Sequence, residues 1–128
     1  MSYYFTKTLD MPFDAAVAHV TEALAAKGFG VLTTIDVKAT MKKKLDVDFK
    51  PYTILGACNP KLALSALQAE DKIGTMLPCN VIVTETAPRK VEVAAVDPVA
   101  SMSAIQNPAL GEVAGKVRQM LSDAVDAL

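Results

Sequence analysis

The stretch LPCNVIVTETAPRKVEVAAV, Leu77–Val96, decides the fold, because it holds two runs of β-forming residues separated by a proline-containing turn. Valine or isoleucine recurs through both runs at the period-two spacing that is typical of a strand with one buried face. We therefore predict an antiparallel hairpin of strands Leu77–Thr84 and Lys90–Val96, joined by a turn at residues 87–89. Alternation places Cys79 and every second residue after it on one face, and Asn80 with its alternates on the other.

The segments on either side of this hairpin predict an alternation of strands and helices. The further strands are expected at Ser2–Lys7, Phe29–Ile35 and Tyr52–Cys58. Helices are expected from Pro12 to Gly28, just after Asp36, from Pro60 to about Glu70, briefly at Pro98, and from Pro108 to the last residue. The order β-α-β-(α)-β-α-β-β-α predicts an α+β fold, with helices laid on a mainly antiparallel sheet. We find no linker, so residues 1–128 form a single predicted domain.

Composition limits the classes of function. The chain of 128 residues is 52% hydrophobic and 21% charged, which indicates a folded core rather than disorder. Its net charge of −1 gives no general attraction to nucleic acid or to an anionic membrane. The first residues lack the pattern of a signal peptide, and no apolar run reaches the roughly 18 residues of a membrane span. We expect a cytoplasmic protein with no nucleic-acid or membrane partner and with reduced thiols.

The two cysteines of the chain occur in similar segments, GACNP at Gly56–Pro60 and LPCNV at Leu77–Val81. Cys58 directly precedes a predicted helix, and the positive end of the helix dipole favours a thiolate there. Cys58 is therefore the better candidate for a nucleophilic or redox thiol. Cys79 follows proline at a strand start and resembles a small buried apolar residue. The alternative for both is that they are inert thiols in the core.

Polar residues beside the prolines and cysteines are the next candidates. Asn59, Asp97 and Asn107 each stand before a proline, where their side chains are expected to cap the helix that follows. Asn80 lies inside a strand and has no such role, although asparagine is depleted in strands. Its amide is expected either to bond to a nearby loop or helix end, or to contact a ligand.

Several established kinds of site are excluded by spacing. A zinc site in one chain needs about four ligands, but the chain has two cysteines and one histidine, His19, so we predict no metal site within one subunit. Two cysteines from each of two subunits could still supply four ligands. The chain contains no CxxC, P-loop, GxGxxG, GxSxG or HExxH motif. The lysines Lys38 and Lys42–Lys44 favour a solvated helix end over an anion-binding patch.

The segments GFGVLTTIDVKATMKKKLDVDFKPYTILGACNP, IGTMLPCNVIV and VAAVDP together resemble the family called Domain of Unknown Function 302. The resemblance covers essentially the whole chain. It implies a single α+β domain of the TATA-box-binding-protein-like class, β-α-β(4)-α with additions, and a homodimer. It implies no biochemical activity. The residues to which the shared segments point are Cys58, Asn59, Cys79, Asn80, Asp97 and Pro98.

Two functional hypotheses follow. The first is a small-ligand-binding or accessory module, with an apolar cavity between the last helix and the sheet; its expected wall is formed by Ile105, Leu110, Val113 and Val117, with Asn80 as the polar group. The second is a thiol-dependent redox or sulfur-carrier protein, in which Cys58 reacts and Cys79 resolves. The second hypothesis requires two neighbouring sulfurs, of which at least one is reachable from solvent.

Overall fold

The computed structural model describes residues 2–128, and its centre is one antiparallel sheet of five strands. Its strands are β1 (Tyr4–Leu9), β2 (Gly30–Asp36), β3 (Tyr52–Cys58), β4 (Cys79–Ala87) and β5 (Lys90–Val96). They lie side by side in the order β1-β5-β4-β3-β2, and every neighbouring pair is antiparallel. The predicted hairpin forms the centre of this sheet as β4 and β5, so the sequence located the core of the fold correctly.

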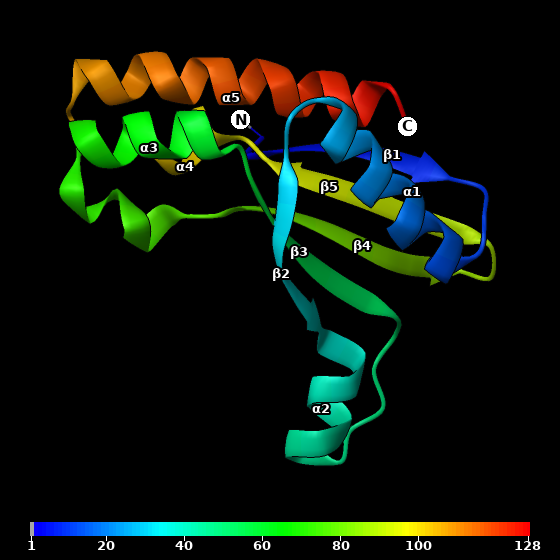
Figure 1. The fold of residues 1–128 in the computed structure, drawn as a ribbon. Helices are drawn as coiled ribbons and strands as arrows, with labels where there is room; N and C mark the ends of the chain where they lie inside the picture. Colours follow the sequence, from blue (N-terminus) through cyan, green and yellow to red (C-terminus); the bar gives the residue numbers. More distant parts are fainter. Residues whose placement is uncertain (1) are drawn as a thin grey trace.

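Helices occupy the connections between strands. They are α1 (Phe13–Ala26), α2 (Val37–Leu45), α3 (Pro60–Ala69), the 3-10 helix η1 (Asp71–Met76), α4 (Pro98–Ser101) and α5 (Pro108–Asp126). Figure 1 shows α1 and α5 together on one side of the sheet, with α2 on its own at the far end of an extension of β2 and β3. The α+β prediction is confirmed, with α2, α3 and α4 as the additional short helices. None of the helices within residues 2–128 is long and apolar enough to cross a membrane.

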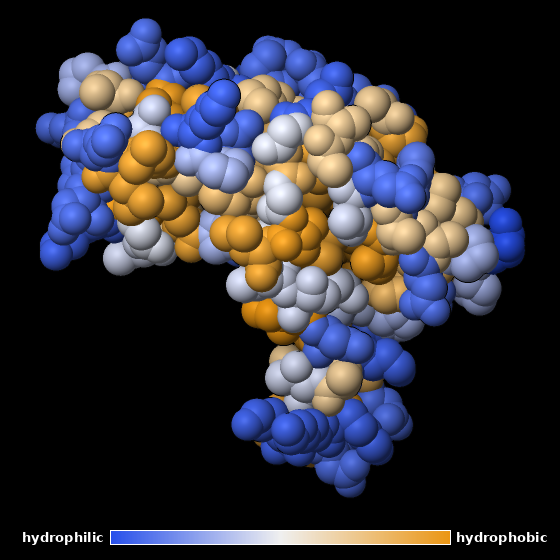
Figure 2. All heavy atoms as spheres, viewed as in Figure 1, coloured by the Kyte–Doolittle hydropathy of each residue, from blue (hydrophilic) through white to orange (hydrophobic). Residues whose placement is uncertain are grey.

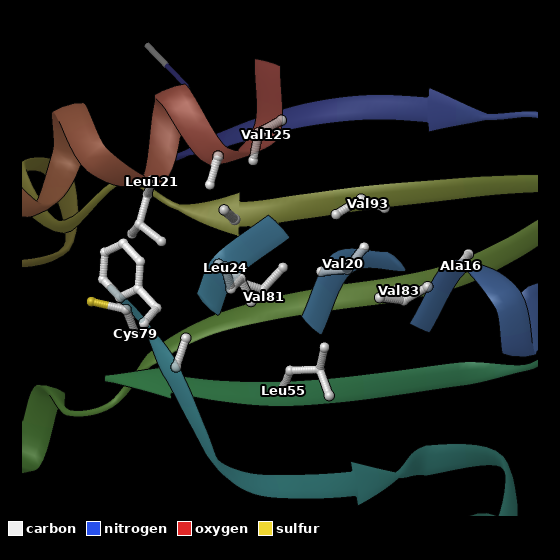
Figure 3. Packing of buried hydrophobic residues seen from close by; sticks show 14 of the residues in the cluster. Ala16, Val20, Leu24, Leu55, Cys79, Val81, Val83, Val93, Leu121 and Val125 are labelled. Atoms are coloured by element: carbon white, nitrogen blue, oxygen red, sulfur yellow. The ribbon is translucent and has the colours of Figure 1, made fainter. Parts of the chain in front are cut away.

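The main core lies between the sheet and the pair α1 and α5 (Figure 3). Val20 and Leu24, one helical turn apart on α1, are 1% and 2% exposed. They face alternate residues of the central strands, among them Val83 and Val93, whose side chains are fully buried. Within residues 2–128 no helix packs across the other face of the sheet, and we call it the open face. It carries apolar and polar residues together: Tyr4, Thr6, Thr8, Thr33, Ile35, Tyr52, Ile54, Gly56, Asn80, Ile82, Thr84, Glu92, Ala94 and Val96.

Strand ends depend on pairing more than on local sequence. β3 and β5 have the predicted bounds, whereas β1 begins and ends two residues later than expected. It does so because Tyr4 to Leu9 pair residue by residue with Val96 to Val91 of β5, and the partner strand limits the ladder. β4 likewise begins at Cys79 instead of Leu77, and it runs on to Ala87 opposite Lys90.

A second apolar cluster lies beyond the end of the sheet. It consists of the buried residues Ala66, Ile73, Met102, Leu110 and Ala114 from α3, η1, α4 and the first half of α5. Asn107 joins its two ends, because its Nδ2 donates to the Ala69 carbonyl at 2.8 Å while its Oδ1 caps α5. The predicted capping role of Asn107 is confirmed, and residues 2–128 form two adjoining apolar clusters of unequal size.

Candidate functional site

The two Cys-Asn segments, 21 positions apart in the chain, are neighbours in the sheet. Strands β3 and β4 pair so that Gly56 faces Asn80 and Ala57 faces Cys79. Contact between the segments is close at Gly56, where a Cβ atom would overlap the Thr33 hydroxyl and lie 2.7 Å from Pro78 Cγ. Only glycine leaves room for both neighbours. The glycine of GACNP thus serves the packing of the proline of LPCNV.

Both thiols line one small apolar cavity, which lies at the seam between the main core and the second cluster. Phe29, Ala57 and Cys79 reach it from the main core, and Ala66, Met102, Leu110 and Ala114 from the second cluster. Its free volume is about 30 Å³, which is the share that one water molecule takes in the liquid. The predicted wall residues Leu110, Val113 and Val117 line it, but Ile105 does not and instead borders a separate hollow with Val99.

The two thiols differ in solvent exposure, but the pKa of each is raised above its ordinary value. Cys58 is half-buried, and burial raises the pKa of its thiol. Cys79 is 8% exposed; burial, and then the nearby charge of Cys58, raise its pKa to about 11. The lowering that we expected for Cys58 at the start of α3 is therefore outweighed by desolvation, which disfavours a thiolate. Both groups are neutral thiols near pH 7.

Asn59 is the helix cap that the sequence predicted. Its Oδ1 accepts a hydrogen bond from the Leu62 backbone N–H at 3.1 Å, and Pro60 opens α3. Asn59 also borders the cavity and approaches the backbone at Gly28, where φ is +86° and a Cβ would lie 3.0 Å from Asn59 Nδ2. The Asn59 side chain thus caps helix α3 and also forms part of the cavity wall.

Asp97 is buried beside the cavity, and its two carboxylate oxygens are already used. Oδ1 accepts from the backbone N–H groups of Val99 and Ala100 at 2.9 and 3.4 Å. Oδ2 accepts from Arg118 Nε at 3.1 Å, and the Arg118 guanidinium also lies 5.2 Å from the centre of the Phe5 ring. Sequence reasoning predicted the capping role but missed Arg118, because nothing local links α5 to β5. Asp97 therefore serves to join β5, α4 and α5.

Asn80 lies outside the cavity, on the open face, so our expectation that it would orient a ligand in the cavity is wrong. Its side chain is exposed and borders a wide hollow of about 360 Å³. The hollow is also lined by Tyr3, Tyr4, Tyr52 and Glu92, none of which the sequence analysis selected. The period-two alternation of the strands could have found Tyr52 and Glu92, since both share the face of Asn80 through the pairs Tyr52–Thr84 and Thr84–Glu92.

Within residues 2–128, no group of three or more His, Cys, Asp or Glu side chains is placed to hold a metal ion. Every buried side-chain nitrogen and oxygen in this part of the chain has a hydrogen-bond partner. Among the residues that line the seam cavity in this part of the chain, the side chains with polar groups are those of Asn59, Cys58 and Cys79.

Comparison with known proteins gives a family and a fold. A family model described as "Domain of unknown function DUF302" matches residues 5–128. The chain is also similar to the crystal structure of an uncharacterized conserved protein DUF302 from Bacillus stearothermophilus, with 26% identity, a TM-score of 0.89 and 98% of each chain covered. None of the curated proteins matches it. With the family model matching nearly its whole length, this chain belongs to the DUF302 family, a domain of unknown function.

Proposed function

We propose that the chain is a small-ligand-binding module whose ligand occupies the seam cavity between the two apolar clusters. The observation that carries this proposal is the place and lining of the cavity: apolar side chains from both clusters converge there with the Asn59 amide and two thiols. Sites for small molecules are usually apolar hollows with a few polar groups that fix the orientation of the ligand. The ligand is accordingly a small and mostly apolar molecule.

Ligand entry requires the second cluster to move, because about 30 Å³ is far below the roughly 300 Å³ of a typical small-molecule pocket. The second cluster holds five buried residues, whereas the main core holds sixteen. Local opening is easiest where few apolar contacts must be broken. Helix α3 is therefore the element that we expect to separate from α5, while the sheet, α1 and the second half of α5 stay in place.

The experiment is native mass spectrometry of the wild-type chain and of two variants of helix α3. Ala63 is half-buried and lines the cavity, so Ala63→Leu fills it; Ser65 is exposed on the same helix, so Ser65→Leu is the matched control. We expect a non-covalent adduct on the wild type and on Ser65→Leu that is absent from Ala63→Leu. The fluorescent probe 1-anilinonaphthalene-8-sulfonate should show the same order of binding. Equal adducts and equal probe binding in all three proteins would contradict the proposal.

A thiol function is the second candidate, and it is favoured by one observation: both cysteines border the same cavity and Cys58 is partly exposed. In that case hydrogen peroxide would oxidise the two thiols to one disulfide, and the two electrons and two protons released would convert the peroxide into two water molecules. The raised pKa values make both the oxidation and a sulfur-carrier role slow at neutral pH, because the thiolate is the reacting form. Free thiols also accord with the cytoplasmic location that we propose.

Alkylation separates the two candidates. With iodoacetamide and no denaturant, Cys58 should be labelled before Cys79, since it is the more exposed thiol. In a separate sample that has not been alkylated, peroxide treatment followed by peptide mapping should show a Cys58–Cys79 disulfide, with the loss of two hydrogen masses, if the thiol function holds. Protection of both thiols until unfolding would exclude the thiol function and would leave the ligand-binding proposal standing.

A further inference from the structure

All three tyrosines of the chain line one hollow on the open face, the same hollow that Asn80 borders. Tyr4 belongs to β1, Tyr3 directly precedes it, and Tyr52 begins β3. Tyr3 and Tyr4 are 67% and 42% exposed, and their rings meet edge to face with 5.0 Å between the ring centres. The chain has no tryptophan. The fold therefore collects at this hollow the aromatic groups that segments far apart in the sequence supply.

The floor of the hollow is apolar and lies over the middle of the sheet. Ile82 of β4 pairs there with Ala94 of β5. The methyl group of Ala94 stands between the longer side chains of Glu92 and Val96 on the same face of β5, which leaves room above it. The volume of about 360 Å³ lies within the roughly 300–1,000 Å³ of small-molecule sites. A ligand of that size fits this hollow without any movement of a helix.

Glu92 supplies the charge of the hollow. Among the lining residues that the structure describes, it is the one with a charged side chain. It is half-buried, and none of the ion pairs within residues 2–128 includes it. A carboxylate that is partly removed from water gains from a cationic partner that also donates a hydrogen bond. The matching ligand therefore carries a positive charge.

The tyrosine rings determine which kind of cation fits. Tyr52 pairs with Thr84, and Thr84 pairs with Glu92, so two strand spacings, about 10 Å, separate the ring from the carboxylate. That distance suits a small molecule better than a single ion. Aromatic faces attract organic ammonium and guanidinium groups. A metal ion would need more acidic ligands, and within residues 2–128 no group of three or more His, Cys, Asp or Glu side chains is placed to hold one.

Asn80 adds a hydrogen-bonding group to the same hollow. Its side chain is exposed, and none of the side-chain hydrogen bonds within residues 2–128 includes it. The sequence analysis left two roles open for this residue, and a bond to a loop or helix end is not formed. An amide oxygen accepts from a ligand N–H, and the amide nitrogen donates. Asn80 is therefore free to orient a ligand.

We propose that the hollow on the open face is a binding site for a small organic cation, with an amine or guanidinium group on an apolar body. The charged group binds Glu92, the apolar body lies on Ile82 and Ala94 between the tyrosine rings, and Asn80 bonds to a polar group of the ligand. This site is separate from the seam cavity, because the two share none of the lining residues that the structure describes.

The main group of lysines lies elsewhere on the surface. α2 holds Lys38 and Lys42–Lys44, and Figure 2 shows the hydrophilic surface at that end of the molecule. The net charge of the chain is only −1, so the protein as a whole attracts a cation weakly. A preference for a cation over a neutral molecule of the same shape therefore reports the local charge at Glu92.

The test is the tyrosine emission of the protein during titration with 2-phenylethylammonium, which is protonated at neutral pH as a lysine side chain is. The neutral 2-phenylethanol and the anionic phenylacetate are probes of similar shape. Emission reports on this hollow, because all three tyrosines line it and the chain has no tryptophan. We expect the cation to bind with a dissociation constant of about 1 mM or below, at least about tenfold more tightly than either other probe.

Three variants locate the binding. Glu92→Gln keeps the size of the side chain and removes its charge, so it should weaken binding of the cation at least about tenfold and leave the alcohol unchanged. Glu85→Gln is the matched control, since Glu85 is half-buried on the neighbouring strand β4 and outside the hollow. Ala63→Leu fills the seam cavity. Both of these variants should bind the cation as the wild type does, so this result is independent of the proposed function.

Several outcomes would overturn the proposal. One is equal affinity for the three probes, which is measured on the wild type and needs no variant. Another is equal weakening by Glu92→Gln and Glu85→Gln, with circular dichroism showing that both are folded. Loss of binding in Ala63→Leu would place the probe in the seam cavity instead. Emission that changes with protein concentration before any probe is added would show that a second copy of the chain covers the hollow.

Nuclear magnetic resonance covers the case in which binding leaves the emission unchanged. The amide signals of Asn80, Ile82 and Ala94 should move during the same titration with 2-phenylethylammonium, because these residues line the hollow. Unchanged emission together with unchanged amide signals would show that the cation does not bind there and would overturn the proposal.

Discussion

The two faces of the sheet are built from the same strands, yet they differ in nearly every physical respect. Val81 and Val83 on β4 are 1% and 0% exposed under α1 and α5, whereas Asn80 and Ile82, one residue away, lie on the open face. Both sets of residues have the strand alternation that the sequence displays. The comparison teaches that alternation divides residues between two faces, but that the cover on each face decides whether apolar residues there form a core or an unpartnered surface.

The largest expected effect comes from a charge placed on each face in turn. Val83→Asp should prevent folding, because an unpaired carboxylate in a sealed apolar core costs more than about 4 kcal/mol. Ile82→Asp, one position away, should leave the chain folded, because that half-buried side chain reaches the open face. Circular dichroism and urea unfolding measure both variants. Comparable unfolding by the two substitutions would show that the open face is covered within one chain.

The second-largest effect on stability is expected from the substitution of a glycine on the open face. Gly56→Ala should destabilise by about 2–4 kcal/mol, because the added methyl group meets the Thr33 hydroxyl and Pro78. Gly30→Ala is the matched control, since no atom lies within 4 Å of its added Cβ, and it should be close to neutral. The midpoint of urea unfolding reports the difference. A neutral Gly56→Ala would mean that β2 and Pro78 shift freely.

The pH dependence of the free energy of unfolding tests whether the Cys79 thiol is buried. Its folded pKa of about 11 lies above the ordinary thiol value of 9.0, so the stabilisation is complete below about pH 9 and is lost as the pH rises through 11. At 1.36 kcal/mol per pKa unit, the loss is about 2–3 kcal/mol. Cys79→Ala should lower stability at pH 7 and should flatten this part of the profile. Other groups titrate in the same pH range, so the measured quantity is the difference in unfolding free energy between the wild type and Cys79→Ala at each pH. If the two pH profiles run parallel, the thiol is not buried.

The smallest expected effect lies at the border of the seam cavity. Asn59→Ala should cost about 1 kcal/mol, because the Leu62 N–H loses its acceptor, while Asn59→Ser and Asn59→Asp should be nearly neutral. Thermal unfolding of the three variants gives the order. If Asn59→Ser destabilises as much as Asn59→Ala, the contribution of Asn59 comes from packing beside Gly28 and the cavity, and capping is a minor part of it.

The sequence by itself determined the features that depend only on residues a few positions apart in the chain. Asn59, Asp97 and Asn107 each accept from N–H groups two or three positions ahead, so an Asn-Pro or Asp-Pro pair was enough to place the helix start. The alternation in β4 likewise divided Cys79 and Val81 from Asn80 correctly. Length, composition and the helix and strand order then gave the α+β class.

Only the tertiary structure decided how distant segments meet. The pairing of Ala57 with Cys79 brought the two thiols to one cavity, and the tertiary packing placed Ile105 at a separate hollow beside Val99. The pKa of Cys58 followed the same rule, because the local helix dipole lost to desolvation by residues far away in sequence. Caps and alternation depend on neighbours along the chain, whereas burial depends on which surfaces the whole chain brings together, and that is why the seam cavity and the hollow beside Asn80 were located only by the structure.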